Sequence, residues 1–221
     1  MLSEFFAEYA ELFAQGTLDT FIMLFVSSAI AYAIGIVLGV VLHLTAPGGL
    51  RPIPVLNAVL GWVVNIGRSL PFIILIVGLI PVTRALVGTA TGVRGVIVPL
   101  VVSAAPFVAR MIEQSLAEVS RDSVEAAEAC GASVPRIVWS VLLPEALPSI
   151  IRGVAVTLIA VLGYTAIAGA VGAGGLGDIA IRYGYYRYQD EVMIVTVVLL
   201  VVLVQLIQSV CDVIARKVDH R

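Results

Sequence analysis

Apolar runs separated by short polar segments form the main pattern along this 221-residue chain. A helix needs about 20 mostly apolar residues to cross the roughly 30 Å hydrocarbon core of a bilayer. Five runs approach or exceed that length: residues 18–44, 55–80, 96–112, 153–171 and 191–210. The pattern therefore predicts an all-α integral membrane protein with five transmembrane helices.

Residues 1–17 differ from the runs that follow. They contain glutamates but no lysine or arginine, so the positive start of a secretory signal is missing and we expect no cleavage. Their apolar residues recur at helical spacing: Phe5, Phe6, Tyr9, Leu12 and Phe13. This spacing is typical of an amphipathic helix at the membrane interface. We therefore divide the chain into an interfacial N-terminal segment and a transmembrane domain, residues 18–221.

Each of the first two apolar runs contains a feature that bears on its packing or its path through the membrane. Gly35 and Gly39 give the first span a smooth face for close helix packing. The second run contains Arg68, Ser69 and Pro71, and an arginine in mid-membrane costs at least about 2.5–3.5 kcal/mol unless it reaches water. Two interpretations remain open: Arg68 lies near the cytoplasmic edge of its span, or this short segment forms a helix break beside a solute pathway.

Composition supports a membrane protein and excludes several functions. The chain is 60% hydrophobic and 13% charged, with a mean hydropathy of +1.08, whereas soluble domains carry about 25% charged residues. The sequence shows no pattern of a metal site and no constellation of a catalytic nucleophile, so we expect no cofactor. It also lacks a Gly-x-x-x-x-Gly-Lys phosphate loop, so we expect no ATP binding through such a loop. His43 lies at a span end and is interpreted as an interfacial residue.

Residues 122–148 form the longest charged segment between the apolar runs, and we interpret them as two short helices. Asp122 and Glu125 have the spacing of a capping box, which predicts a helix start at or just after Asp122. Gly131 is suited to the left-handed conformation that ends a helix.

The second helix of this hairpin has its own start and stop signals. Ser133 is a candidate N-cap, and Pro135 falls in the first turn, where a missing N–H does no harm. Pro144 and Pro148 predict that the helix ends near Leu143. An exposed hairpin between membrane spans suggests a docking surface.

The hairpin resembles the EAA loop of ABC importer permeases. The matching residues are Glu125-Ala126-Ala127, Gly131 and Val141-Leu142-Leu143-Pro144. The family prefers isoleucine where Val141 stands. The resemblance implies that the hairpin is cytoplasmic and sits in a cleft of a separate ATPase subunit. It assigns coupling to seven residues: Glu125, Ala126, Ala127, Gly131, Val141, Leu143 and Pro144. A surface hairpin without a special role is the alternative.

Positive charges give an independent prediction of orientation. With the hairpin inside, the inner segments hold Arg51, Arg110, Arg121, Arg136, Arg152, Arg216, Lys217 and Arg221. The outer segments hold Arg84, Arg94, Arg182 and Arg187. Because lysine and arginine favour the cytoplasmic side, we expect an outer N-terminus and a cytoplasmic C-terminus in a bacterial inner membrane.

A wider resemblance covers nearly the whole chain. Residues 68–76, 104–110 and 163–177 are similar to the permease subunits of bacterial methionine importers. This family has the type I ABC importer architecture. The resemblance implies uptake of methionine in both enantiomers. It also implies four kinds of partner: two copies of the ATPase, a second copy of the permease, an extracytoplasmic substrate-binding protein and membrane lipid.

The fourth span offers candidates for the pathway. Residues 163–172 are mostly small, and Ile167 is the bulky aliphatic exception, with Tyr164 one turn earlier. In a two-fold pair, two Ile167 side chains could meet at the axis as an apolar gate. Packing of Ile167 on a neighbouring helix is the alternative. We assign Tyr164, Ile167, Arg68 and Ser69 to the pathway.

Two other functions remain open on sequence alone. The first is a permease of the same ABC class for another amino acid, a peptide or an osmolyte. The second is an ion-coupled secondary transporter, which would usually show paired repeats and ionisable residues deep in the membrane. No such repeat is apparent.

Overall fold

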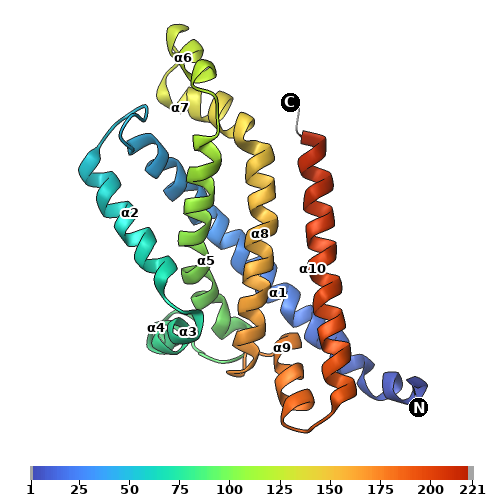
Figure 1. Cartoon of the computed structure of the whole chain (residues 1–221). Coiled ribbons are helices and arrows are strands. Elements are labelled where there is room, and N and C mark those ends of the chain that lie inside the picture. The colour runs from blue at the N-terminus through green and yellow to red at the C-terminus, as the bar shows by residue number, and fades with distance from the viewer. Residues whose placement is uncertain (1, 219–221) are drawn as a thin grey trace. The chain divides into compact units, whose positions relative to one another are not determined.

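The computed structural model describes residues 2–218, with side chains from residue 8 onward. The side chains of Phe5 and Phe6 and the whole of Arg221 lie outside the described residues. The elements, in order, are α1 (Leu2–Thr45), α2 (Pro54–Ser69), α3 (Phe72–Gly78), α4 (Ile80–Val87), α5 (Gly92–Ala117), α6 (Arg121–Ala129), α7 (Val134–Ile137), the π-helical segment η1 (Val138–Leu142), α8 (Leu143–Gly169), α9 (Gly175–Ile179), the π-helical segment η2 (Ala180–Tyr185) and α10 (Asp190–Val218) (Figure 1).

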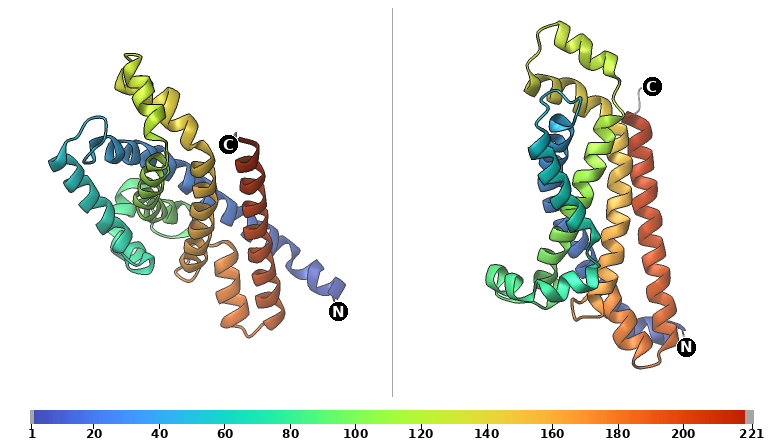
Figure 2. Two further views of the ribbon diagram at one scale, coloured as in Figure 1. Left: turned by 45° about the horizontal axis from the view of Figure 1, so that its top comes forward. Right: turned by 60° about the vertical axis from the view of Figure 1, so that its left-hand side comes forward.

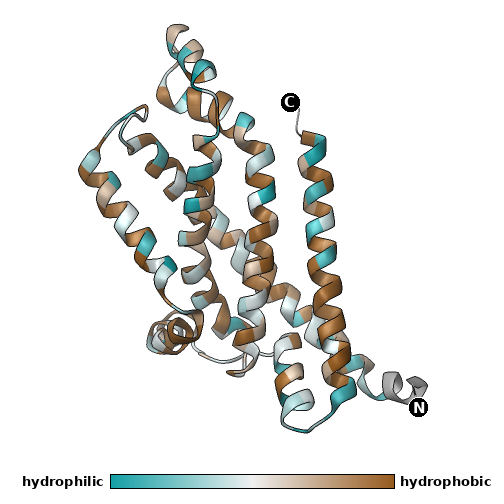
Figure 3. Cartoon of the chain, viewed as in Figure 1, coloured by the Kyte–Doolittle hydropathy of each residue, from teal (hydrophilic) through white to brown (hydrophobic). Residues whose placement is uncertain are grey.

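Four helical stretches of the described chain are long and apolar enough to cross a membrane: Glu8–Thr45, Gly92–Ala117, Val134–Gly169 and Asp190–Val218. A fifth span results if Pro54–Ser69 and Phe72–Gly78 count as one bent span. Apolar residues predominate along α1, α8 and α10 (Figure 3). The predicted all-α membrane fold is confirmed.

Two predicted segments differ in detail from the structure. The run 55–80 is not one helix: α2 ends at Ser69 and α3 begins at Phe72, because Pro71 lacks an N–H and restricts Leu70. The structure therefore contains the predicted helix break after Arg68, whereas its position beside a solute pathway stays a prediction. At the other end, α1 is one continuous helix through residue 17, so the N-terminal segment is not a separate helix. Its interfacial position stays a prediction.

The chain divides into two compact units, to which α1, α5, α8 and α10 each contribute. Unit 1 contains Met1–Ile30, Leu70–Ala104 and Leu158–Ile207, and unit 2 contains Ala31–Ser69, Ala105–Thr157 and Gln208–Arg221.

In unit 1, α9 packs closely against α1 and α8. Leu176 is fully buried, and its backbone N–H donates to the Thr20 hydroxyl at 2.9 Å, while that hydroxyl donates to the Gly16 carbonyl at 2.8 Å. A Cβ added at Gly177 would lie 2.6 Å from the Ala166 Cα. Only glycine fits at this approach of two backbones.

In unit 2, the predicted smooth face of α1 packs against α5. A Cβ added at Gly35 would lie 2.6 Å from the Val108 Cβ, and one at Gly39 would lie 2.7 Å from the Ile112 Cβ. At one end of this unit, α6 and α7 extend beyond the ends of α5 and α8 (Figures 1 and 2).

Candidate functional site

The first hairpin helix, α6, begins earlier than predicted. Its N-cap is Ser120, whose hydroxyl accepts a hydrogen bond from the Asp122 N–H at 3.2 Å. Asp122 therefore lies inside the first turn, where its carboxylate complements the positive end of the helix dipole. Sequence analysis missed Ser120 because the spacing of Asp122 and Glu125 gave an equally good capping pattern.

Gly131 ends α6 as predicted. It has a φ of +75°, in the left-handed region that favours glycine. Its N–H donates to the Glu128 carbonyl at 2.8 Å, and the Ala132 N–H donates to the Ala127 carbonyl at 3.1 Å. These two bonds form a Schellman motif, which fixes the direction of the chain where it leaves the helix.

The second hairpin helix does not end near Leu143, so that prediction is wrong. It starts at the predicted N-cap Ser133, although without a side-chain cap bond, and continues through η1 into α8. The Leu143 N–H donates to the Val138 carbonyl in a π-type bond. Pro144 follows where this register returns to α-helical, so its missing N–H costs one bond without ending the helix. Pro148 is accommodated inside α8.

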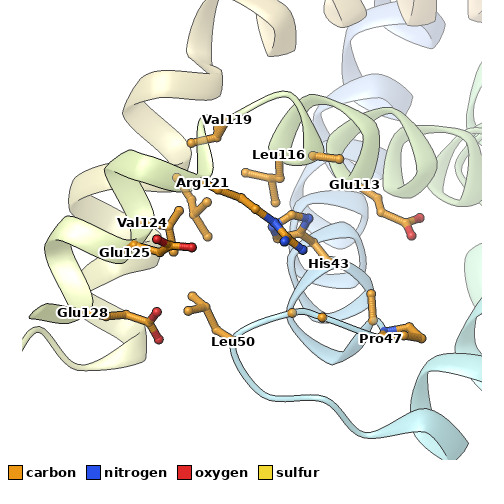
Figure 4. A pocket seen from close by; sticks show the side chains of 15 residues that line it. His43, Pro47, Leu50, Glu113, Leu116, Val119, Arg121, Val124, Glu125 and Glu128 are labelled. Carbon is orange, nitrogen blue, oxygen red and sulfur yellow. The ribbon is translucent and has the colours of Figure 1, made fainter.

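The two sides of α6 face different surroundings. Arg121, Val124, Glu125 and Glu128 line a cavity (Figure 4). At 100° per residue, Ser123, Ala126, Ala127 and Cys130 fall on the opposite side. No residue of α6 is buried. Ala126 and Cys130 are exposed while Ser123 and Ala127 are half-buried, so the helix offers a narrow, partly open surface of small side chains.

The cavity has a volume of about 620 Å³ and lies within unit 2. Its other walls are the end of α1, the turn 46–50, the end of α5 and Leu142. Arg121 extends from the start of α6 toward His43 (Figure 4). Glu125 therefore faces the protein's own cavity, and His43 is a cavity-lining residue. Sequence analysis identified neither the turn nor Arg121 as part of this site.

Arg110 on α5 forms an ion pair within its own helix and a hydrogen bond to α2. Arg110 contacts Glu113 at 2.6 Å and donates to the Asn65 side-chain oxygen at 2.9 Å. The ion pair neutralises Glu113, and the bond to Asn65 joins α2 to the helix that leads into the hairpin. Within the described residues, no group of His, Cys, Asp or Glu could hold a metal ion.

The remaining predicted coupling residues lie where η1 joins α8. Val141 and Leu143 are half-buried and Pro144 is exposed, while the intervening Leu142 is almost fully buried. Leu142, together with the buried Ile137, anchors the hairpin to unit 2. Val141 and Leu143 thus belong to the base of the hairpin, whereas Ala126 and Ala127 lie on α6.

The predicted pathway residues fall into two groups. Arg68 and Ser69 are exposed at the end of α2 in unit 2, and the Ser69 hydroxyl donates to the Asn65 carbonyl at 2.7 Å. Tyr164 and Ile167 are in unit 1. The Tyr164 ring stacks on Phe72 with centroids 4.9 Å apart, and Ile167 is 42% exposed. Sequence analysis did not identify Phe72 as a partner of Tyr164.

Comparisons with known proteins agree over nearly the full length. A family model described as binding-protein-dependent transport system inner membrane component matches residues 33–221. The probable D-methionine transport system permease protein MetI of Vibrio cholerae is 51% identical over 220 residues, covering 100% of this chain and 98% of that protein. The methionine import system permease protein MetP of Bacillus subtilis is 41% identical over 180 residues, 81% of each chain.

Solved structures share the architecture. A chain of the MetNI methionine ABC transporter, in inward-facing conformations, is 47% identical with a TM-score of 0.95, covering 96% of this chain and 99% of that one. A chain of an amino acid ABC transporter solved with histidines has a TM-score of 0.76 at 20% identity, with 96% of each chain covered, which shows the shared fold.

Proposed function

Because the chain belongs to the family of binding-protein-dependent transport system inner membrane components, we propose that it is the permease subunit of an ATP-driven methionine importer. The match to a chain of a methionine ABC transporter at 47% identity and a TM-score of 0.95 carries this proposal. The chain is a non-catalytic membrane subunit, and ATP is hydrolysed by a separate ATPase. Both enantiomers of methionine are transported.

Uptake by the reconstituted transporter tests the substrate. Vesicles holding the permease, its ATPase and the substrate-binding protein should accumulate labelled L- and D-methionine only when ATP is present on the ATPase side. An excess of unlabelled methionine should suppress the signal, whereas unrelated amino acids should not. Accumulation driven by an ion gradient without ATP would refute the proposal, and preferential uptake of another solute would refute methionine as the substrate.

The hairpin couples the permease to the ATPase. Its partly open face of small residues on α6 suits close packing in a protein cleft, and its fixed Gly131 turn lets α6 move as a lever with the ATPase. The hairpin and the C-terminus lie in the cytoplasm and the N-terminus outside, an orientation supported by the excess of positive charge on the hairpin side. Glu125 is exposed at the cavity side of α6 and offers the ATPase a polar anchor.

Two copies of the permease form the pathway with two ATPases. The exposed Ile167 follows Gly163 by one turn on α8, and no atom lies within 4 Å of a Cβ placed at Gly163. This open, small-residue surface is suited to the two-fold axis.

An Ile167→Cys variant should form a disulfide crosslink across the pair in one nucleotide state only, because a gate closes in one conformation. Crosslinking is compared with and without bound nucleotide, with Ile194→Cys on an exposed position of α10 as the control. Absence of a crosslink at position 167 in every nucleotide state would refute the proposed gate.

A further inference from the structure

The segment between α9 and α10 carries exposed tyrosines that the coupling and gating proposals do not use. Tyr185, Tyr186 and Tyr188 are 63%, 69% and 87% exposed. The sequence pattern is typical of an aromatic belt, in which tyrosines contact lipid headgroups at the membrane interface. The structure shows a more specific arrangement.

The exposed rings stand on an ordered base. The Tyr183 ring meets Tyr9 edge-on, with centroids 6.4 Å apart, and the Arg187 guanidinium lies 4.4 Å from the Tyr183 centroid. The Gln189 side chain donates to the Tyr9 hydroxyl at 3.0 Å. Gly184 is buried, and a Cβ added there would lie 2.9 Å from the Met193 Cβ. These contacts hold the segment that carries the three exposed rings against α1 and α10.

Tyr188 has an unusual backbone conformation. Its φ is +56°, and among residues 2–218 it is the only non-glycine residue with positive φ. A left-handed conformation costs a bulky residue about 1–3 kcal/mol and persists only where surrounding contacts impose it. The strained position holds the most exposed ring of the segment. A lipid contact does not require such a fixed direction, whereas a protein interface benefits from rings that are already placed.

The side of the membrane on which the tyrosine segment lies follows from the number of spans between it and the coupling hairpin. Along the chain, α8 lies between the coupling hairpin and this segment and belongs to a helix long and apolar enough to cross a membrane. In the proposed importer this one crossing separates the two segments. Under the proposed function, the tyrosine segment therefore faces the side from which solute arrives. Tyrosine and arginine are also the residue types enriched at energetic centres of protein interfaces.

We infer that Tyr185, Tyr186 and Tyr188 form a docking surface for the extracytoplasmic substrate-binding protein. This inference rests on the proposed function and adds the surface at which solute is delivered. The rings supply contact area, and the backbone that carries them is ordered before the partner arrives, which lowers the entropy cost of binding.

Binding of the labelled methionine-binding protein to the complete transporter in lipid nanodiscs tests the surface. Two variants are compared with the wild type: the double change Tyr185→Ala/Tyr186→Ala, and Tyr188→Gly, which keeps the left-handed backbone and removes only the ring. Each should raise the Kd by about tenfold or more, as for centrally placed aromatic residues. ATP hydrolysis in the absence of the binding protein should remain unchanged.

Leu86→Ala is the matched control, because Leu86 is 68% exposed on α4, which span counting places on the same side. Its Kd should stay within about twofold of wild type, since an apolar contact outside the interface contributes little. Wild-type affinity in both tyrosine variants, with reduced retention in the bilayer, would overturn the inference in favour of a lipid belt. Failure of the wild-type transporter to bind any binding protein would refute the proposed function itself.

Discussion

Replacing Gly131 with valine is expected to abolish most ATP-coupled methionine uptake while the ATPase still co-purifies with the permease. The φ of +75° at this position suits glycine, and a β-branched residue would be strained there by about 1–3 kcal/mol. No atom lies within 4 Å of an added Cβ, so the strain comes from the backbone rather than from a collision. Relief of that strain would rotate α6 relative to α7 and misdirect the lever.

Gly131→Asn is the matched control, since asparagine tolerates the left-handed conformation and adds a side chain of similar size. Both variants are measured for methionine uptake and for stimulation of ATP hydrolysis by the loaded binding protein. The asparagine variant should retain most of both activities, whereas the valine variant should lose uptake and stimulation together. Unchanged uptake and unchanged stimulation in Gly131→Val would contradict the coupling role of the hairpin.

Local rules predicted much of this hairpin from sequence. The left-handed Gly131 and the start of the second helix at Ser133 depend on the conformational preferences of one or two residues. The position of Pro144 did not reveal that the helix continues. A proline signals a missing N–H, but whether the helix ends depends on whether neighbouring bonds can adjust. Here a π-helical segment absorbs the change of register, and the buried Ile137 and Leu142 stand at its two ends.

The cavity beside α6 illustrates what sequence patterns do not contain. It joins His43, the turn 46–50, Glu113 and α6, which are distant along the chain. No periodicity links these segments, so their meeting follows only from the packing of α1 on α5. Gly35 and Gly39 predicted that another helix can pack closely on α1, but they did not identify α5 as that helix. Phe72 was likewise unpredictable as a partner of Tyr164, since their contact follows from the tertiary fold.

Gly177→Ala is expected to destabilise the permease strongly although it adds a single methyl group. The new Cβ would lie 2.6 Å from the Ala166 Cα and 2.9 Å from the Ala166 carbonyl carbon. Backbone atoms of α8 cannot move aside as a flexible side chain could, so α9 must shift. Overpacking of this kind costs about 1–3 kcal/mol, and the shift would also strain the buried hydrogen bond from Leu176 to Thr20.

Gly61→Ala provides the comparison, because Gly61 lies within α2 and no atom is within 4 Å of its added Cβ. Alanine in an unobstructed helix position is favoured over glycine by about 0.5–1 kcal/mol, so this variant should melt at the same temperature or higher. Thermal unfolding of the purified complex, followed by the loss of its monodisperse size-exclusion peak, should give a lower melting temperature for Gly177→Ala and an unchanged or higher one for Gly61→Ala. Equal melting temperatures would mean that α9 can move away from α8 without cost, and that the glycine contact does not hold unit 1 together.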